Sequence, residues 1–90
     1  MDGHIYIPRP GDREIILQNL EYFRKMDDEQ LQVESEAKKK LGIFGVHQQA
    51  LHLIAFNIVM KERFNDSPIE IVDNCLIRFK DNPDIRKPEK

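Results

Sequence analysis

The chain has 90 residues, which is the size of one small domain. Hydrophobic residues make up 40% of it and charged residues 33%, a composition too apolar for intrinsic disorder. The net charge of −2 argues against a protein that binds nucleic acid or anionic membranes through bulk charge. A single cysteine can form no disulfide within the chain and is too few for a Cys-based metal site, so we expect a cytoplasmic location.

The first eleven residues, 1–11, are predicted to form an extended arm. Residues 5–7 (Ile-Tyr-Ile) are strand formers, and Pro8 and Pro10 exclude a helix here. Because a single strand is not stable alone, we expect the arm to lie across the helices or to pair with the arm of another copy.

Residues 12–26 carry the first helical pattern. Ile16, Leu20 and Phe23 recur at helical spacing and form the centre of an apolar face. The face is wide, so we expect this helix to contact more than one neighbour.

Residues 28–41 predict a second helix. Asp27 with Gln30 three residues later is close to a capping box, and Gly42 is a natural C-terminal stop. We expect this helix to be the outermost one because its apolar stripe is thin. The stripe consists of Val33, Ala37 and Leu41.

Residues 45–64 predict a third helix that is apolar on nearly every side. Helices of this kind are buried, so we place it at the centre of the domain. A polar line remains through Gln48, His52 and Arg63. Asn57 falls among apolar positions, and we expect its amide to be buried and either bonded to a loop or Tyr22, or paired across a helix interface.

Residues 67–81 predict a fourth helix, because Ser67, Pro68 and Glu70 together form the pattern of a capping box with proline at the first helical position. Apolar residues follow at helical spacing, and Ile77 alone points to the polar side. Residues 82–90 are charged and contain proline, so we expect a frayed tail.

No set of residues favours catalysis, a metal or a cofactor. His4, His47 and His52 are not spaced to share a metal ion. Cys75 has no basic neighbour that would activate it, and we interpret it as a small buried apolar residue. The chain lacks threonine and has no glycine-rich phosphate loop. We therefore expect a non-enzymatic protein.

One alternative is a DNA-binding regulator. The basic run before Leu41, Gly42 and Ile43 resembles the junction of a helix-turn-helix motif. The contacts would come from the second helix and the start of the third, at Lys38, Lys39, Lys40 and Gln48. Against it, the following helix is too apolar to lie in a groove, and nearby glutamates cancel the positive charge.

These patterns together predict an all-α domain: a compact four-helix domain over residues 12–81, with an extended arm before it. Short connections favour antiparallel neighbours, as in an up-down bundle. The leading hypothesis is a non-enzymatic protein–protein interaction or regulatory module. It would form a homodimer and present a helical surface to another protein, without nucleic acid or membrane as partner. The predicted contact residues are Tyr6, Ile7, Phe44, His52, Phe56, Val59 and Ile77.

Overall fold

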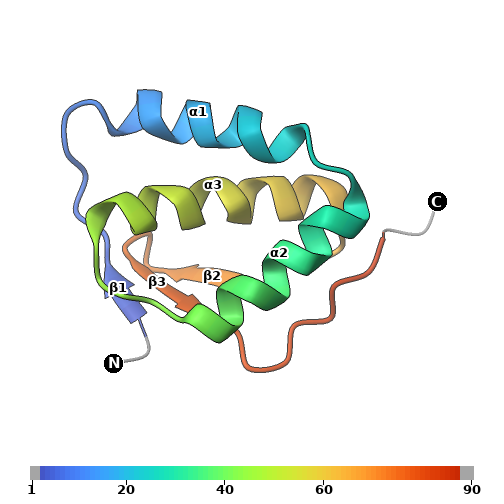
Figure 1. Ribbon diagram of the computed structural model, residues 1–90. Helices are drawn as coiled ribbons and strands as arrows, with labels where there is room; N and C mark the ends of the chain where they lie inside the picture. The colour runs from blue at the N-terminus through green and yellow to red at the C-terminus, as the bar shows by residue number, and fades with distance from the viewer. Residues whose placement is uncertain (1–2, 88–90) are drawn as a thin grey trace.

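The computed structural model describes residues 3–87 and shows a mixed α/β domain rather than the predicted all-α one. Its helices are α1 (Asp12–Arg24), α2 (Asp28–Leu41) and α3 (His47–Arg63). Its strands are β1 (Gly3–Ile5), β2 (Ile69–Val72) and β3 (Leu76–Phe79). They form one antiparallel sheet in the order β1-β3-β2. In Figure 1, α3 lies between α1 and the sheet, and α2 crosses in front.

The helices α1 and α3 run parallel, not antiparallel as in the expected up-down bundle. Their first residues meet where His47 contacts Asp12, and their last turns meet where Arg24 binds Glu62. The helix α2 carries the chain back from the end of α1 to the start of α3 (Figure 1). Parallel packing is possible because this return is itself a helix of 14 residues.

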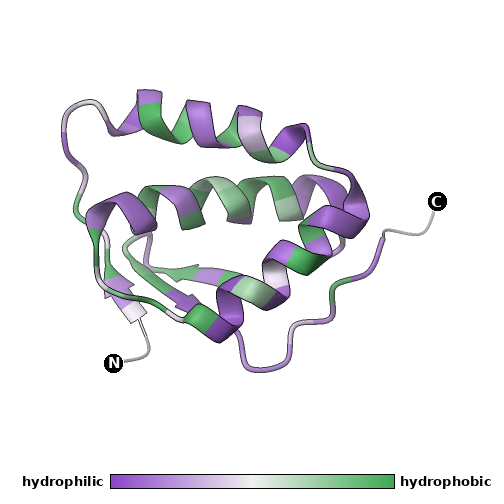
Figure 2. Ribbon diagram, viewed as in Figure 1, coloured by the Kyte–Doolittle hydropathy of each residue, from purple (hydrophilic) through white to green (hydrophobic). Residues whose placement is uncertain are grey.

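The core is centred on α3, which Figure 2 shows as apolar along most of its length. Gly45, at a φ of 80°, and the extended Val46 keep the start of the predicted helix outside α3, which begins at His47. Eight of its 17 residues are buried. Six of them form one hydrophobic cluster with the buried apolar side chains of the other elements, which are Leu20, Phe23, Leu31, Ile69 and Ile77.

The predicted fourth helix, over residues 67–81, is wrong: this segment is the β2–β3 hairpin. Asp73 and Asn74 join the strands with φ angles of 53° and 60°. This left-handed conformation ends a helix and suits a hairpin turn, and Asp and Asn tolerate it better than most side chains. The Cys75 N–H closes the turn by donating to the Val72 carbonyl at 3.1 Å.

The capping pattern that suggested a helix instead opens a strand. The Ser67 Oγ accepts a hydrogen bond from the Ile69 N–H at 3.2 Å, which is the same local interaction that a helix cap would make. The next carbonyl, of Pro68, accepts from the Lys80 N–H at 2.9 Å and extends the pairing of the two strands. The local hydrogen bond therefore does not distinguish the two structures.

The alternation along the hairpin explains Ile77, which was the outlier of the helical interpretation. In the strand, Ile77 lies opposite Ile71 and is fully buried in the core. Glu70 and Arg78 lie opposite each other and form an ion pair on the other face of the sheet. A period of two places every second residue on the same face, as these strands require.

The N-terminal arm pairs with β3 of its own chain rather than with another copy. The strand β1 is extended by the Tyr6 N–H, which donates to the Cys75 carbonyl at 2.7 Å. Gly3 allows the close approach, because a Cβ there would lie 2.9 Å from the Leu76 Cδ1. Residues 1–2 of the predicted arm and 88–90 of the predicted tail lie outside the described residues.

Candidate functional site

Three polar groups converge where α1 and α3 begin. The Tyr6 hydroxyl and the Arg9 backbone N–H donate to the Asp12 Oδ2 at 2.8 and 2.7 Å. The His47 Nε2 lies 2.8 Å from the other carboxylate oxygen, and the rings of Tyr6 and His47 stack with centroids 5.7 Å apart. The cluster ties the N-terminal arm to both helices.

Asp12 is 7% exposed, yet its surroundings stabilise the charged carboxylate. Burial alone would raise its pKa, but the hydrogen bonds from His47, Arg9 and Tyr6 outweigh burial and lower the pKa to about 2. The position at the start of α1 also favours a negative charge.

This cluster contains a carboxylate–imidazole pair but no third group of a catalytic triad. No hydroxyl or thiol of a Ser or Cys hydrogen-bonds to His47 in residues 3–87. Within the same residues, no three His, Cys, Asp or Glu side chains are placed to share a metal ion. The geometry therefore supports a structural tie.

A second cluster lies between the three helices around Lys38. Its ammonium lies 5.2 Å from the ring centroid of Phe23, 4.9 Å from that of Phe56, and 2.8 Å from the Glu34 carboxylate. The side chain is only 11% exposed. The aromatic faces and the carboxylate stabilise a cation that would otherwise be costly to bury.

His52 lies beside this cluster, with its ring 4.7 Å from that of Phe23 and its Nδ1 3.2 Å from the Asn19 Oδ1. Burial lowers the pKa of His52, and the nearby Lys38 charge lowers it further. Both effects favour the neutral imidazole, which packs between α1 and α3.

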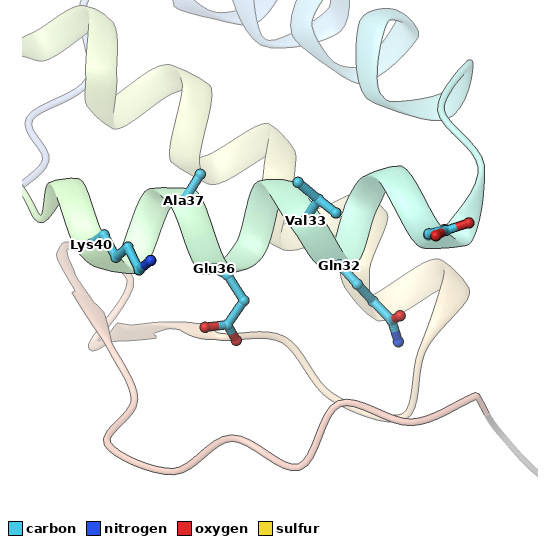
Figure 3. Close-up of a pocket in the computed structure, with 6 residues that line it drawn as sticks. Gln32, Val33, Glu36, Ala37 and Lys40 are labelled. Atoms are coloured by element: carbon cyan, nitrogen blue, oxygen red, sulfur yellow. The ribbon is translucent and has the colours of Figure 1, made fainter.

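The outer face of α2 carries apolar side chains that the domain does not bury. Leu31 and Ser35 are buried on the inner side of α2, whereas Val33 and Leu41 are 63% and 66% exposed. The predicted stripe thus faces away from the core. We define the outer face of α2 by seven residues, Glu29, Gln32, Val33, Glu36, Ala37, Lys40 and Leu41, of which all but Leu41 line a shallow depression (Figure 3).

Apolar exposure continues past the end of α2. Phe44 and Val46 are 65% and 53% exposed in the connection to α3. This connection is held in place by Gln49, whose Nε2 donates to the Gly42 carbonyl and whose Oε1 accepts from the Phe44 N–H. Phe44 is therefore presented to solvent by an ordered loop.

The structure does not bring the seven predicted contact residues together on one surface. Phe56, Val59 and Ile77 are 0% exposed and belong to the core of the single chain. The residues that are well exposed are Ile7 and Phe44. The two others are partly buried and occupied in the clusters described above: Tyr6 and His52.

The residues of the DNA-binding alternative also point in different directions. Lys38 is turned inward toward the aromatic rings, whereas Lys40 belongs to the outer face of α2. Lys39 is partly buried and Gln48 is exposed.

The Asn57 amide is buried as expected, since the residue is 7% exposed. Its Oδ1 has no hydrogen-bond partner among the described residues.

None of the predicted contact residues lies on the outer face of α2, because the apolar stripe of an amphipathic helix normally faces the core. Two features of the sequence are consistent with the observed packing. Leu31 and Ser35 lie on the opposite side of the helix from Val33, and the aliphatic stem of a lysine such as Lys38 can cover aromatic rings.

Comparison with models of known protein families, with characterised proteins and with solved structures finds no match for this chain. No helix within residues 3–87 has the length and apolarity to cross a membrane.

Proposed function

We propose that this protein is a non-enzymatic interaction module that associates with a second copy of itself through the outer face of α2. The observation that carries the proposal is the row of Val33, Ala37 and Leu41, which follows the spacing of one helix face and points away from the core. A monomer gains nothing from exposing such a row, and contiguous exposed apolar surface is typical of interaction sites.

The size of the face sets the expected strength. A helix of 14 residues is about 21 Å long, so two such helices cover less than the roughly 800 Å² per partner of a standard interface. We therefore expect a dissociation constant in the micromolar range or weaker. A cytoplasmic location is part of the proposal and is supported by the single cysteine.

Sedimentation velocity over concentrations from about 1 μM to 1 mM tests the proposal. The wild-type chain is expected to shift from one copy to two, and Val33→Glu is expected to remain a single copy because it places a charge at the centre of the contact. Leu17→Glu is the matched control, since Leu17 is 49% exposed on α1. A wild-type chain that stays monomeric at 1 mM contradicts the proposal, as does Val33→Glu that associates like wild type.

A further inference from the structure

We infer that the second copy lies antiparallel across the outer face of α2, with the acidic start of each helix against the basic end of the other. This inference rests on the proposed function and adds the orientation and the charge contacts of the two chains. Figure 1 shows α2 at the front of the domain with no other helix or strand drawn over it, and Val33, Ala37 and Lys40 of the outer face are exposed.

The charges along α2 are strongly divided. The first turn carries Asp28 and Glu29, and the last turn carries three lysines. On the outer face this division leaves Glu29 at one end and Lys40 at the other, eleven residues or about 16 Å apart.

Glu29 and Lys40 are the charges that the outer face carries at the two ends of α2. Lys38 is bound by Glu34, and Asp28 is bound by Arg63 and Lys87. Neither Glu29 nor Lys40 makes an ion pair with another residue of the described part of the chain. The outer face therefore has a negative end at Glu29 and a positive end at Lys40, with the exposed Glu36 one turn before Lys40.

A parallel arrangement would place Glu29 beside Glu29 of the second copy and Lys40 beside its Lys40. Both contacts are repulsive. The antiparallel arrangement places each Glu29 near Lys40 of the second copy, twice over because of the two-fold symmetry. It also opposes the two helix dipoles, which is the more favourable orientation.

The apolar row fits the same arrangement. A two-fold axis that crosses α2 near residue 35 places Val33 opposite Ala37 of the second copy, so that a larger side chain meets a smaller one. Glu29 then lies opposite residues 40–41 of the second copy. The same register places Leu41, at the end of the apolar row, beside Glu29 of the second copy, so the apolar contact is centred on Val33 and Ala37.

Charge exchange on the otherwise intact protein tests the orientation. Glu29→Lys and Lys40→Glu are each expected to weaken dimerisation by about fivefold, because each variant creates two like-charge contacts. The double variant is expected to return the dissociation constant to the wild-type value. In a parallel dimer each single change replaces one like-charge contact with another, so the single variants dimerise as strongly as the wild type and leave no loss for the double variant to recover.

Two controls separate charge contacts from folding. Both single changes oppose the dipole of α2, so a folding defect would be greatest in the double variant, which is the one expected to recover. Exchange of the exposed α1 pair, Glu21→Lys with Lys25→Glu, is expected to leave dimerisation unchanged.

The outcomes distinguish the two proposals. Single variants that dimerise as strongly as wild type, or a double variant that does not recover, in a protein whose association is abolished by Val33→Glu, overturn the antiparallel orientation and leave the proposed function in place. A wild-type chain that does not associate overturns both.

Discussion

The His47 imidazole and the Asp12 carboxylate lie 2.8 Å apart at the point where α1 and α3 both begin. The residues are 35 positions apart in the sequence, and their contact fixes the parallel orientation of the two helices at one end. Asp12 also binds the N-terminal arm, through the Tyr6 hydroxyl. One carboxylate therefore joins two helices and the segment that leads to β1.

The first prediction concerns Asp12→Asn. The substitution removes the charge to which His47, Arg9 and Tyr6 are directed, so we expect a lower melting temperature at pH 7. The folded pKa of about 2 lies below the ordinary value of 3.8, so this contribution is complete above pH 3.8 and is lost as the pH falls toward 2. Thermal unfolding should show that the difference in melting temperature between Asp12→Asn and the wild type becomes smaller over that pH range. Asp81→Asn, at an exposed turn, should lack this pattern.

The second prediction concerns the acid side of neutrality. The folded pKa of His52 lies below its ordinary value of 6.5, so the unfolded chain binds the proton more readily. The neutral His52 ring therefore contributes its full stability to the folded state well above pH 6.5, and this contribution falls as the pH drops below 6.5. Urea unfolding at about pH 7.5 and pH 5 should show that wild type loses more stability than His52→Gln. An equal loss in both proteins would contradict the assignment.

The third prediction concerns the coupling between Lys38 and His52. Lys38→Met keeps most of the side-chain volume and removes the charge, so the pKa of His52 should rise. It should remain below 6.5 because burial is the larger cause. Proton NMR titration of the His52 ring measures the shift. Lys39→Met, at the next residue, is the matched control and should leave the titration unchanged.

The fourth prediction compares two adjacent positions of α3. Val59 is 0% exposed and Ile58 is 36% exposed. Val59→Glu should lower the free energy of unfolding by about 4 kcal/mol or more, which is enough to unfold many small domains. Ile58→Glu should lower it by less than about 1 kcal/mol, since its charge reaches solvent. Circular dichroism during denaturant unfolding measures both, and similar losses would show that Val59 is not in the core.

The fifth prediction uses the hairpin turn. Asn74 has a φ of 60°, so Asn74→Gly should raise the free energy of unfolding by up to about 1 kcal/mol, and Asn74→Val should lower it by about 1–2 kcal/mol. In a helix the glycine would instead lower the stability by a few tenths of a kcal/mol, because glycine is a poorer helix former than asparagine. The sign of the glycine effect in chemical denaturation therefore separates the hairpin from the helix.

Local sequence signals were sufficient for the three helices. The capping box of Asp27 and Gln30 is confirmed by both of its hydrogen bonds, at 2.8 and 3.0 Å, and Gly42 ends α2 as expected. These signals act within one turn of helix, so they need no information from the rest of the chain. The apolar pattern of α3 was equally informative. A helix that is apolar on nearly every side is stable only in the core, and eight of the residues of α3 are buried there.

Packing decided which face of α2 is buried. The regular spacing of Val33, Ala37 and Leu41 is typical of a buried helix face. In the structure, Leu31 is the buried side chain instead, and Lys38 lies over two aromatic rings. A pattern of apolar residues gives the possible faces of a helix, and the shape and charge of its neighbours select one. The candidate interaction surface exists because of this selection.

Long-range pairing decided the structure of residues 67–81. Ser67 can make the same type of hydrogen bond at the start of a helix and at the start of this strand, so this residue favours neither structure. The strand is selected by partners far away in the chain: β1 pairs with β3, and Ile77 packs in the core. Local residue chemistry thus set the ends of the helices, whereas the buried face of α2 and the hairpin depend on contacts that exist only after the chain has folded, because burial and strand pairing are properties of neighbours in space.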